Sequence, residues 1–327
     1  MDPEIVPIRP DAPDAGYGSE HRAHSPLHDW RVKAAVQTVL SAIPAGASLN
    51  YLLQRHVTRT LPISDVELVA QVGKAQRNLA ALQRHGSVAV ADARLYEFGV
   101  GWDLLVPLVH YAMGAERQTV IDIRPLARTD LVRDTADRLT GSAARLGLPR
   151  EPMLDPGAGD VRALILPMGI EYRAPADARG VDLPDGSVDL VTSCDVIEHI
   201  PISELPAILG ECHRLLAVGG VLNVRVDYQD HYWYFDVRRS PYSFLRYGES
   251  RWRRFNPGLH YQSRIRHPQL LEIAHAAGFA LAEDQHPAPT DDDLEALAGV
   301  PIASEFRRFA AEELAIRFAT VTFVKRS

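Results

Sequence analysis

The residues from Leu95 to Asp103 combine acids and glycines in a pattern that could bind a nucleotide. The segment reads LYEFGVGWD, in which a strand-like run ends at Gly99 and Gly101 before a helix-like run begins. Asp122 ends a second buried-strand pattern about twenty residues past this loop, the spacing at which α/β nucleotide folds place an acid on the ribose hydroxyls. The two segments therefore predict an adenosine-containing ligand.

The charges around this loop indicate which adenosine compound is bound. A dinucleotide site needs the pattern G-x-G-x-x-G, whose third glycine lets the helix pack closely, but Leu104 stands at that position. Glu97 and Asp103 flank the loop, and two carboxylates would repel a pyrophosphate but suit an ammonium and a sulfonium. These features favour S-adenosylmethionine. An ordinary strand-turn-helix with glycines for turn geometry is the alternative for this segment.

A second pattern, between Asp177 and Gly220, is more specific. It consists of Asp177-Ala178, the run LPDGSVDLVTSCDVIEHIP from Leu183 to Pro201, then Glu211, His213-Arg214-Leu215-Leu216 and Gly219-Gly220. In this order and spacing the chain closely resembles the class I S-adenosylmethionine-dependent methyltransferases, and the resemblance runs from about Leu95 to Phe279. Val188, where the family usually has an aromatic residue, and Ala217-Val218, in place of the common Lys-Pro, depart from the family only at packing or turn positions.

The resemblance implies an α/β fold with a Rossmann-like, doubly wound sheet of seven strands, the last of them antiparallel. The sequence agrees, because strand-like and helix-like segments alternate from Arg94 onward. Strands are expected near residues 94–98, 119–123, 171–174, 188–193, 221–226, 279–284 and 319–325. Helices are expected near residues 104–113, 127–139, 161–166 and 203–216, followed by one that Pro268 opens and Gly278 caps.

The fold assigns roles to the residues of the first two strands. Gly99 and Gly101 would let the backbone approach the methionine end of the cofactor, where a side chain would occupy the ligand's space. Asp122 would accept hydrogen bonds from both ribose hydroxyls. Glu97 is expected to hold the backbone or the ammonium group of the ligand.

Further cofactor residues are expected at the ends of the third and fourth strands. By the resemblance, Asp177 would bind the adenine amino group, with Ala178 alongside. Ser193 and Asp195 leave the fourth strand at its carboxyl end and so should face the crevice in which open α/β sheets bind ligands. Glu198-His199 looks catalytic, but in the resemblance this pair sits at a helix start and is often structural.

The segment from Asp227 to Arg266 forms an insertion after the fifth strand, where we expect substrate choice to be made. Eleven of the chain's 24 aromatic residues fall in these 40 residues. They are Tyr228, Tyr232, Trp233, Tyr234, Phe235, Tyr242, Phe244, Tyr247, Trp252, Phe255 and Tyr261. For most of them a satellite core beneath the insertion is the expected role.

Tyr228 and His231 directly follow the fifth strand, so both are expected over the carboxyl edge of the sheet. His231 is the predicted general base, because an unperturbed imidazole titrates near neutral pH, with Tyr228 or Asp195 orienting it. Four further residues are predicted to bind the acceptor: Tyr234, His260, Tyr261 and Arg264.

Methyl transfer from a sulfonium requires no metal, because the methyl group is already activated and the protein has only to align a nucleophile with it. No metal is therefore expected. Ligation by His231 with Asp227, Asp230 or Asp236 is the alternative, although acids just after a strand more often cap the loop.

The leading hypothesis is an S-adenosylmethionine-dependent methyltransferase that acts on a small molecule, a secondary metabolite or a sugar-linked intermediate. A second hypothesis is transfer or cyclisation of the aminocarboxypropyl group with release of methylthioadenosine. A third is a non-catalytic module that senses the cofactor, which the aromatic and polar insertion disfavours. The cofactor motifs leave the acceptor and its nucleophilic atom open.

The composition of the chain disfavours several classes of binding partner. The net charge of −7 disfavours nucleic acid, and no run reaches the roughly eighteen apolar residues of a membrane span. Cys194 and Cys212 are only two cysteines, which indicates a reducing cytoplasm. The expected protein is a cytoplasmic monomer or homodimer whose partner is a small-molecule acceptor.

Three regions are expected along the chain. Residues 1–25 read as a flexible tail, 26–90 as a helical cap, and 91–327 as the cofactor-binding domain, with the insertion at 227–266. Within the cap, Ser64 and Glu67 form a predicted capping box, and the helix that follows should end at about His85 with Gly86 as its cap.

Overall fold

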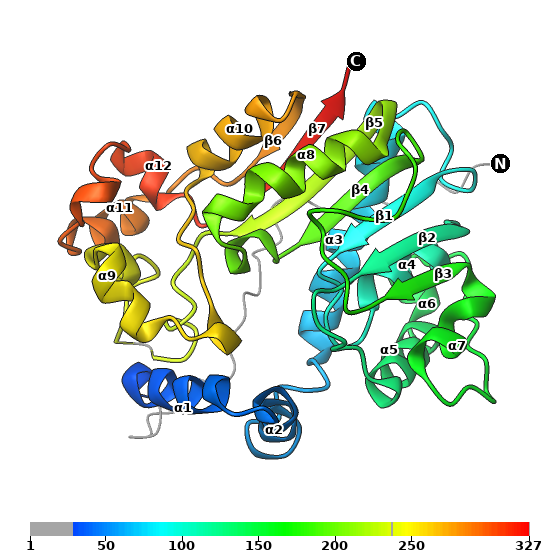
Figure 1. Cartoon of the computed structure of the whole chain (residues 1–327), viewed down its shortest axis with the longest axis horizontal. Coiled ribbons are helices and arrows are strands. Elements are labelled where there is room, and N and C mark those ends of the chain that lie inside the picture. The colour runs from blue at the N-terminus through cyan, green and yellow to red at the C-terminus, as the bar shows by residue number, and fades with distance from the viewer. Residues whose placement is uncertain (1–28, 237, 327) are drawn as a thin grey trace.

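The computed structural model describes residues 29–236 and 238–326, so the expected tail, residues 1–25, lies outside the described part. One sheet of seven strands has the order β3-β2-β1-β4-β5-β7-β6 (Figure 1). The strands are β1 (Arg94–Phe98), β2 (Arg117–Ile121), β3 (Ile170–Arg173), β4 (Val188–Cys194), β5 (Leu216–Asp227), β6 (Phe279–Gln285) and β7 (Phe318–Lys325). The first five are parallel, and β7 runs antiparallel between β5 and β6. The expected Rossmann-like α/β fold is confirmed.

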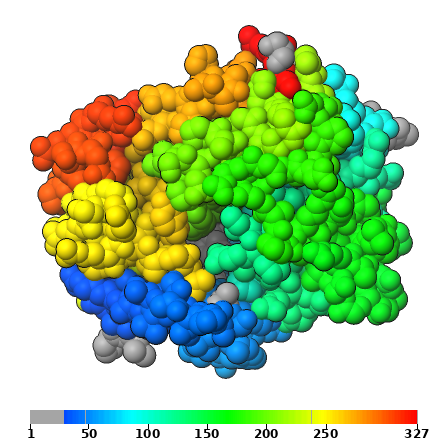
Figure 2. Space-filling model, viewed as in Figure 1, coloured from blue at the N-terminus to red at the C-terminus, as the bar shows by residue number. Residues whose placement is uncertain are grey.

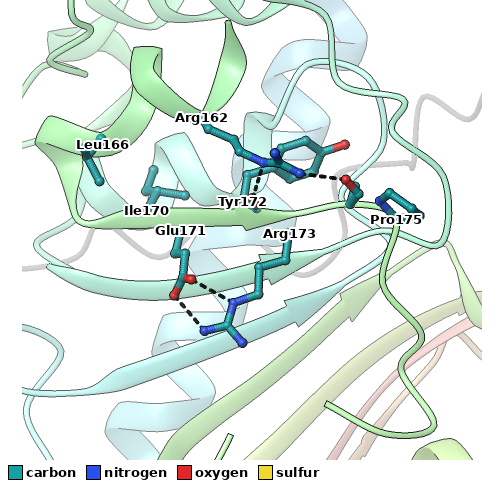
Figure 3. Close-up of a pocket in the computed structure, with 8 residues that line it drawn as sticks. Arg162, Leu166, Ile170, Glu171, Tyr172, Arg173 and Pro175 are labelled. Atoms are coloured by element: carbon teal, nitrogen blue, oxygen red, sulfur yellow. Dashed lines mark hydrogen bonds and ion pairs between the residues drawn. The ribbon is translucent and has the colours of Figure 1, made fainter. Parts of the chain in front are cut away.

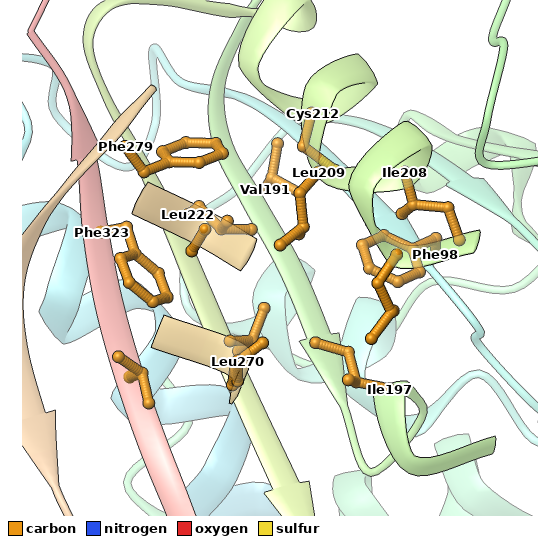
Figure 4. Close-up of a cluster of buried hydrophobic side chains, with 14 of the residues drawn as sticks. Phe98, Val191, Ile197, Ile208, Leu209, Cys212, Leu222, Leu270, Phe279 and Phe323 are labelled. Carbon is orange, nitrogen blue, oxygen red and sulfur yellow. The ribbon is translucent and has the colours of Figure 1, made fainter. Parts of the chain in front are cut away.

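Helices cover both faces of the sheet. On one face lie α3 (Asp65–His85), α4 (Leu105–Ala112), α5 (Thr129–Gly141), α6 (Ala143–Leu146) and α7 (Val161–Ile165), and on the other α8 (Leu205–Leu215) and α10 (His267–Ala276). On α5 the buried positions Leu131, Val132, Ala136 and Leu139 recur at helical spacing and face the sheet. On the other face, α8 and α10 bury Leu209 and Leu270 against the strands (Figure 4).

The second strand ends earlier than expected. The pattern predicts a strand over 119–123, but β2 stops at Ile121. Asp122 instead turns the chain, because its side chain accepts hydrogen bonds from the backbone N–H groups of Gly101 and Arg124. The shift leaves the acid just beyond the carboxyl end of the strand.

The N-terminal helices pack in two different places. The segments α1 (Trp30–Ala42), α2 (Gly46–Leu52) and a π-helical turn (Leu53–Val57) lie beside the insertion and the sheet edge, whereas α3 packs on the sheet itself (Figure 1). The Ser64 hydroxyl caps α3 by accepting from the Glu67 N–H at 3.2 Å, and Gly86 ends the helix as expected. Within the described ranges no helix combines the length and apolarity that crossing a membrane requires.

A second hydrophobic core lies outside the sheet. It joins Trp30 of α1, aromatics of the insertion, and a segment between β6 and β7 that carries α11 (Asp291–Ala298) and α12 (Ala311–Ala315). Its buried aromatics from the insertion are Tyr232, Tyr242, Phe244, Tyr247 and Trp252. The expected satellite core therefore exists, and the chain between the last two strands contributes to it, which the sequence pattern did not indicate.

Candidate active site

The glycine loop follows β1 with both glycines in the left-handed backbone region. Gly99 has φ +82°, and a Cβ there would lie 2.4 Å from a methyl group of Val196, so only glycine lets the β1 and β4 loops approach this closely. Gly101 has φ +69°, but a Cβ on it would meet no atom of the chain within 4 Å among the described residues. Its requirement is conformational, and the space beside it is open.

Asp122 lies against this loop, as the sequence predicts. One carboxylate oxygen accepts from the Gly101 N–H at 3.2 Å and the other from the Arg124 N–H at 3.0 Å. Burial raises the pKa of the Asp122 carboxyl above its usual value. The two strand ends are thus joined through a carboxylate that retains lone pairs for a hydroxyl-bearing ligand.

Asp177 lies on the loop that follows β3. This loop is tied to the second strand end by a hydrogen bond from the Ala176 N–H to the Asp122 carbonyl, 2.9 Å long. The Asp177 carboxylate forms a two-pronged ion pair with Arg179, which lowers its pKa. Ala178 packs against the main core. The predicted adenine residue is therefore near the loop but engaged with a neighbouring arginine.

Asp195 is held by two cations just beyond β4. Its carboxylate lies 2.8 Å from Nζ of Lys74 on α3 and also pairs with Arg225 on β5. These two charges hold its pKa well below the usual range, so the carboxylate stays ionised and is a poor proton acceptor. Ser193, two residues earlier, donates to the Phe98 carbonyl at 3.2 Å and fastens β4 to β1.

A buried acid and a buried histidine lie beneath the glycine loop. Glu97 is 3% exposed, and burial raises its pKa to about 8. His110 of α4 is 1% exposed, and burial lowers its pKa to about 3. Their nearest side-chain atoms, Oε2 and Nδ1, are 3.9 Å apart, and Asn78 Nδ2 lies 3.4 Å from His110 Nε2. Both groups are therefore mostly neutral at pH 7 in the cofactor-free chain.

The chain after β5 forms a compact polar turn. The Asp227 side chain accepts from the Gln229 N–H at 2.9 Å, and its other oxygen accepts from the Tyr234 hydroxyl at 2.5 Å. His231 Nε2 lies 3.5 Å from the same Asp227 oxygen, which is too long for a good hydrogen bond. This turn brings two of the predicted residues, His231 and Tyr234, to one carboxylate.

Three histidines from separate segments meet beside this turn. The ring centroid of His231 is 5.0 Å from that of His199 and 6.2 Å from that of His260. Desolvation of the His199 ring, together with the neighbouring His231, lowers the pKa of His199 to about 4. His199 also anchors Tyr261, whose carbonyl lies 2.7 Å from its Nδ1. The structure thus gathers His231, His260 and Tyr261 in one place and adds His199.

Tyr228 does not join this group. Its side chain is 1% exposed and lies in the main core, with its hydroxyl 3.2 Å from His267 Nδ1. Its carbonyl accepts from Arg266 at 2.7 Å. The side chain turns inward because the first residue after β5 continues the strand's alternation of faces.

Arg264 is likewise a structural residue in this conformation. It is 2% exposed and pairs with Glu249 at 2.9 Å and Glu305 at 2.8 Å. Its guanidinium also lies 5.4 Å from the ring centroid of Trp252. These contacts link the insertion to the segment between β6 and β7. They engage the guanidinium group that the sequence predicts to bind the acceptor.

Two residues of the N-terminal helices reach the site without any sequence signal. Lys33 Nζ of α1 lies 4.9 Å from the ring centroid of Phe235, and the surrounding protein lowers the lysine pKa to about 8. The Ser41 hydroxyl accepts from the Leu259 N–H at 3.0 Å and so fixes α1 beside His260. The space-filling view shows the molecule hollowed between these helices, the insertion and the sheet (Figure 2).

Helix α2 also touches the glycine loop. Tyr51 stacks on Trp102 of the loop with ring centroids 5.4 Å apart, and the Arg128 guanidinium lies 4.9 Å from the Tyr51 ring. The Tyr51 hydroxyl donates to Asp130 at 3.0 Å. This contact joins the N-terminal helices to the expected cofactor loop.

A surface cavity of about 350 Å³ lies elsewhere, at the β3 edge of the sheet (Figure 3). Arg162 crosses it and donates to the carbonyls of Tyr172 at 3.2 Å and Ala174 at 2.8 Å. Glu171 and Arg173 form an ion pair on the same strand. These groups satisfy and cover an exposed strand edge, so we assign the cavity a structural role.

One family model matches part of the chain, and solved methyltransferase structures are similar to it. Residues 160–224 match a family model described as a methyltransferase domain. No curated protein matches the chain. An S-adenosylmethionine dependent methyltransferase from Mesorhizobium loti is 17% identical, with a TM-score of 0.40 over 76% of this chain and 96% of the other. A putative sarcosine dimethylglycine methyltransferase from Galdieria sulphuraria is 12% identical, with a TM-score of 0.45 over 80% and 88%. The family match spans α7 to β5 and contains Asp195 and His199.

Proposed function

Because the chain belongs to the class I S-adenosylmethionine-dependent methyltransferases and uses S-adenosyl-L-methionine as its cofactor, we propose that it methylates a small-molecule acceptor. The cofactor would lie across the carboxyl ends of β1 and β2. Gly101 leaves its backbone accessible there, and Asp122 offers carboxylate lone pairs to the ribose hydroxyls.

The observation that carries this proposal is the short chain connection between the contact of the glycine loop and the histidine group. Gly99 lies against Val196, which is three residues before His199, and His199 lies beside His231. A methyl group on a cofactor bound at the loop would therefore point toward a polar, solvent-open hollow. Such a hollow suits an acceptor that must be held in line with the sulfonium.

The acceptor would bind between α1, the insertion and the sheet edge. Tyr234 and His260 lie beside His231, which is the residue expected to act on the nucleophile, and Lys33 lies beside Phe235 of the same insertion. Asp227 lies close enough to stabilise positive charge on His231. The hollow lies between segments of one chain (Figure 2).

Turnover of the cofactor tests this proposal directly. The protein is incubated with S-adenosylmethionine alone and with a panel of hydroxylated, amino and phenolic small molecules, and products are identified by mass spectrometry. S-adenosylhomocysteine that forms only with an acceptor, together with an acceptor heavier by one methyl group, supports the proposal. Methylthioadenosine, or tight cofactor binding with no turnover across the panel, overturns it.

A further inference from the structure

Three side chains from the segments that follow β4 and β5 present ligand atoms to one point. An oxygen of Glu198 and one ring nitrogen each from His199 and His231 all lie within 4.8 Å of one another. Two imidazoles and a carboxylate form a ligand set that divalent first-row transition ions such as Zn²⁺ and Fe²⁺ bind. The geometry points to a binding site for one such ion, made by Glu198, His199 and His231.

The hydrogen bonding of His199 occupies Nδ1 and leaves Nε2 free to bind a metal. Its Nδ1 lies 2.7 Å from the carbonyl of Tyr261, which can only accept, so Nδ1 must carry the proton. The lone pair of the neutral ring is therefore on Nε2. Metal-binding histidines typically donate their second ring N–H to a carbonyl or carboxylate in this way, which fixes both tautomer and orientation.

Glu198 and His231 have buried atoms that a cation would satisfy. Glu198 is 2% exposed; one of its oxygens lies 3.3 Å from the Asp227 N–H, and the other, Oε2, has no hydrogen-bond partner within residues 29–236 and 238–326. His231 Nε2 is also buried and has no hydrogen-bond partner in the same ranges, its nearest acid being Asp227 at 3.5 Å. A buried carboxylate oxygen without a partner is costly, and coordination removes that cost.

A second group of two histidines and an acid has no free nitrogen on its central histidine. His267, Asp284 and His286 also lie close enough together to share an ion. However, both nitrogens of His267 are engaged, Nδ1 with the Tyr228 hydroxyl at 3.2 Å and Nε2 with Asp284 at 2.9 Å. The second group is therefore a hydrogen-bonded chain, and it supplies a matched control.

The metal site rests on the proposed function and specifies its acceptor. Three protein ligands would leave coordination positions that an acceptor could occupy through oxygen. A hydroxyl bound to such an ion loses its proton to water more readily. Its oxygen then forms the new bond to the methyl carbon while the C–S bond breaks, and the sulfur keeps the electron pair as a thioether. The acceptor class is thus an alcohol or phenol, and His231 acts as a ligand in place of a free base.

Metal titration of the chelator-treated, full-length protein tests the site without any acceptor or cofactor. We expect one Zn²⁺ per chain by calorimetry, and Co²⁺ to give visible d–d absorption. His199→Ala, Glu198→Gln and His231→Gln should each weaken Zn²⁺ binding at least tenfold. His286→Ala should bind as the wild type does. Binding of S-adenosylhomocysteine by every variant checks that each one folds.

The outcomes separate this site from the proposed function. Wild-type protein that binds no Zn²⁺ or Co²⁺, or variants at positions 198, 199 and 231 that bind both ions as tightly as the wild type, would overturn the metal site while leaving methyl transfer open. Loss of binding in His286→Ala alone would overturn it as well, by moving the ion to the second group. Specific Zn²⁺ binding at the site in a protein that methylates nothing would retain the site and overturn the proposed function.

Discussion

The cofactor end and the acceptor end of the hollow are built in different ways. At the cofactor end, the glycine loop and Asp122 come from neighbouring parallel strands and are joined by one hydrogen bond of 3.2 Å. At the acceptor end, His199, His231 and His260 come from three separate segments, and α1, which is distant in sequence, packs against the segment that carries His260. A parallel sheet positions the first group by its topology, whereas the second depends on how an insertion packs.

The two ends also treat charge differently. Near the cofactor loop, the Asp195 carboxylate is compensated by Lys74 and Arg225, and burial keeps Glu97 protonated. At the acceptor end, Asp227 lies among histidines and a tyrosine, and Glu198 has an unpaired oxygen in the described part of the chain. Glu97 and Glu198 each keep one oxygen without a hydrogen-bond partner in the described part of the chain, so the difference between the ends lies in the two cations that compensate Asp195. Substitutions at each end should therefore separate binding of the cofactor from turnover.

Replacement of His231 by Ala should produce the largest effect on activity. We expect turnover to fall by about 10²- to 10⁴-fold, the range for loss of a group that assists proton removal, whether as base or through a bound ion. Single-turnover assays with a saturating acceptor measure this loss. Retention of full activity would make His231 a structural residue of the insertion.

The Glu97→Gln variant tests whether burial beneath the glycine loop raises the pKa of Glu97. Because the folded-state pKa is raised from 4.5 to about 8, the unfolded chain releases this proton first, and wild-type stability falls as pH rises from about 4.5 to 8. Relative to wild type, Glu97→Gln should therefore gain a few kcal/mol, to order of magnitude, between pH 5 and 8. Urea unfolding of both cofactor-free proteins at these two pH values measures the difference. An equal pH dependence in both would show that Glu97 ionises normally.

The Asp122→Ala variant should weaken cofactor binding by about 2–3 kcal/mol, because charged hydrogen bonds from a buried site to the ribose would be lost. Asp122→Glu should be intermediate. Calorimetric titration with S-adenosylhomocysteine gives the two affinities, and an unchanged affinity in the alanine variant would place the ribose elsewhere.

The contact between Tyr51 and Trp102 should make a smaller contribution to cofactor affinity. Tyr51→Ala removes the stack and the contact with Arg128, and we expect a loss of about 0.5–1.5 kcal/mol. Tyr51→Phe keeps the ring and loses only the hydrogen bond to Asp130, so it should bind nearly as the wild type does. Equal losses in the two variants would assign the effect to that hydrogen bond.

Tyr228→Phe should have the smallest effect on turnover, within about threefold, because the hydroxyl lies in the core beside His267. The variant should lose about 0.5–1.5 kcal/mol of stability through that bond. Steady-state assays and thermal unfolding measure both quantities. A tenfold loss of turnover with unchanged stability would show that the Tyr228 hydroxyl takes part in the reaction.

The cofactor end could be predicted because its information is local. Gly99, Gly101 and Asp122 occur at a spacing that a parallel α/β unit requires, and the strand order follows from alternating patterns. Even here, the ion pairs of Asp195 with Lys74 and Arg225 were missed, since nothing in a helix pattern marks one lysine as buried.

The acceptor end could be predicted only in part. Chain position predicts Tyr228 and His231 together, but the alternation of side chains along β5 turns Tyr228 into the core, and His231 lies instead beside Tyr234 and His260. Arg264 reads as a ligand-binding cation in the sequence, whereas Glu249 and Glu305 neutralise it. Lys33 had no signal at all, because its place depends on docking of α1 against the insertion.

The central claim is that Asp122 binds the cofactor and His231 does not. It is tested most directly by titrating S-adenosylhomocysteine into three proteins: wild type, Asp122→Ala and His231→Ala. The structure predicts that Asp122→Ala binds about 30- to 150-fold more weakly, the equivalent of 2–3 kcal/mol, and that His231→Ala binds as tightly as the wild type does. Loss of affinity in His231→Ala together with wild-type affinity in Asp122→Ala would contradict it.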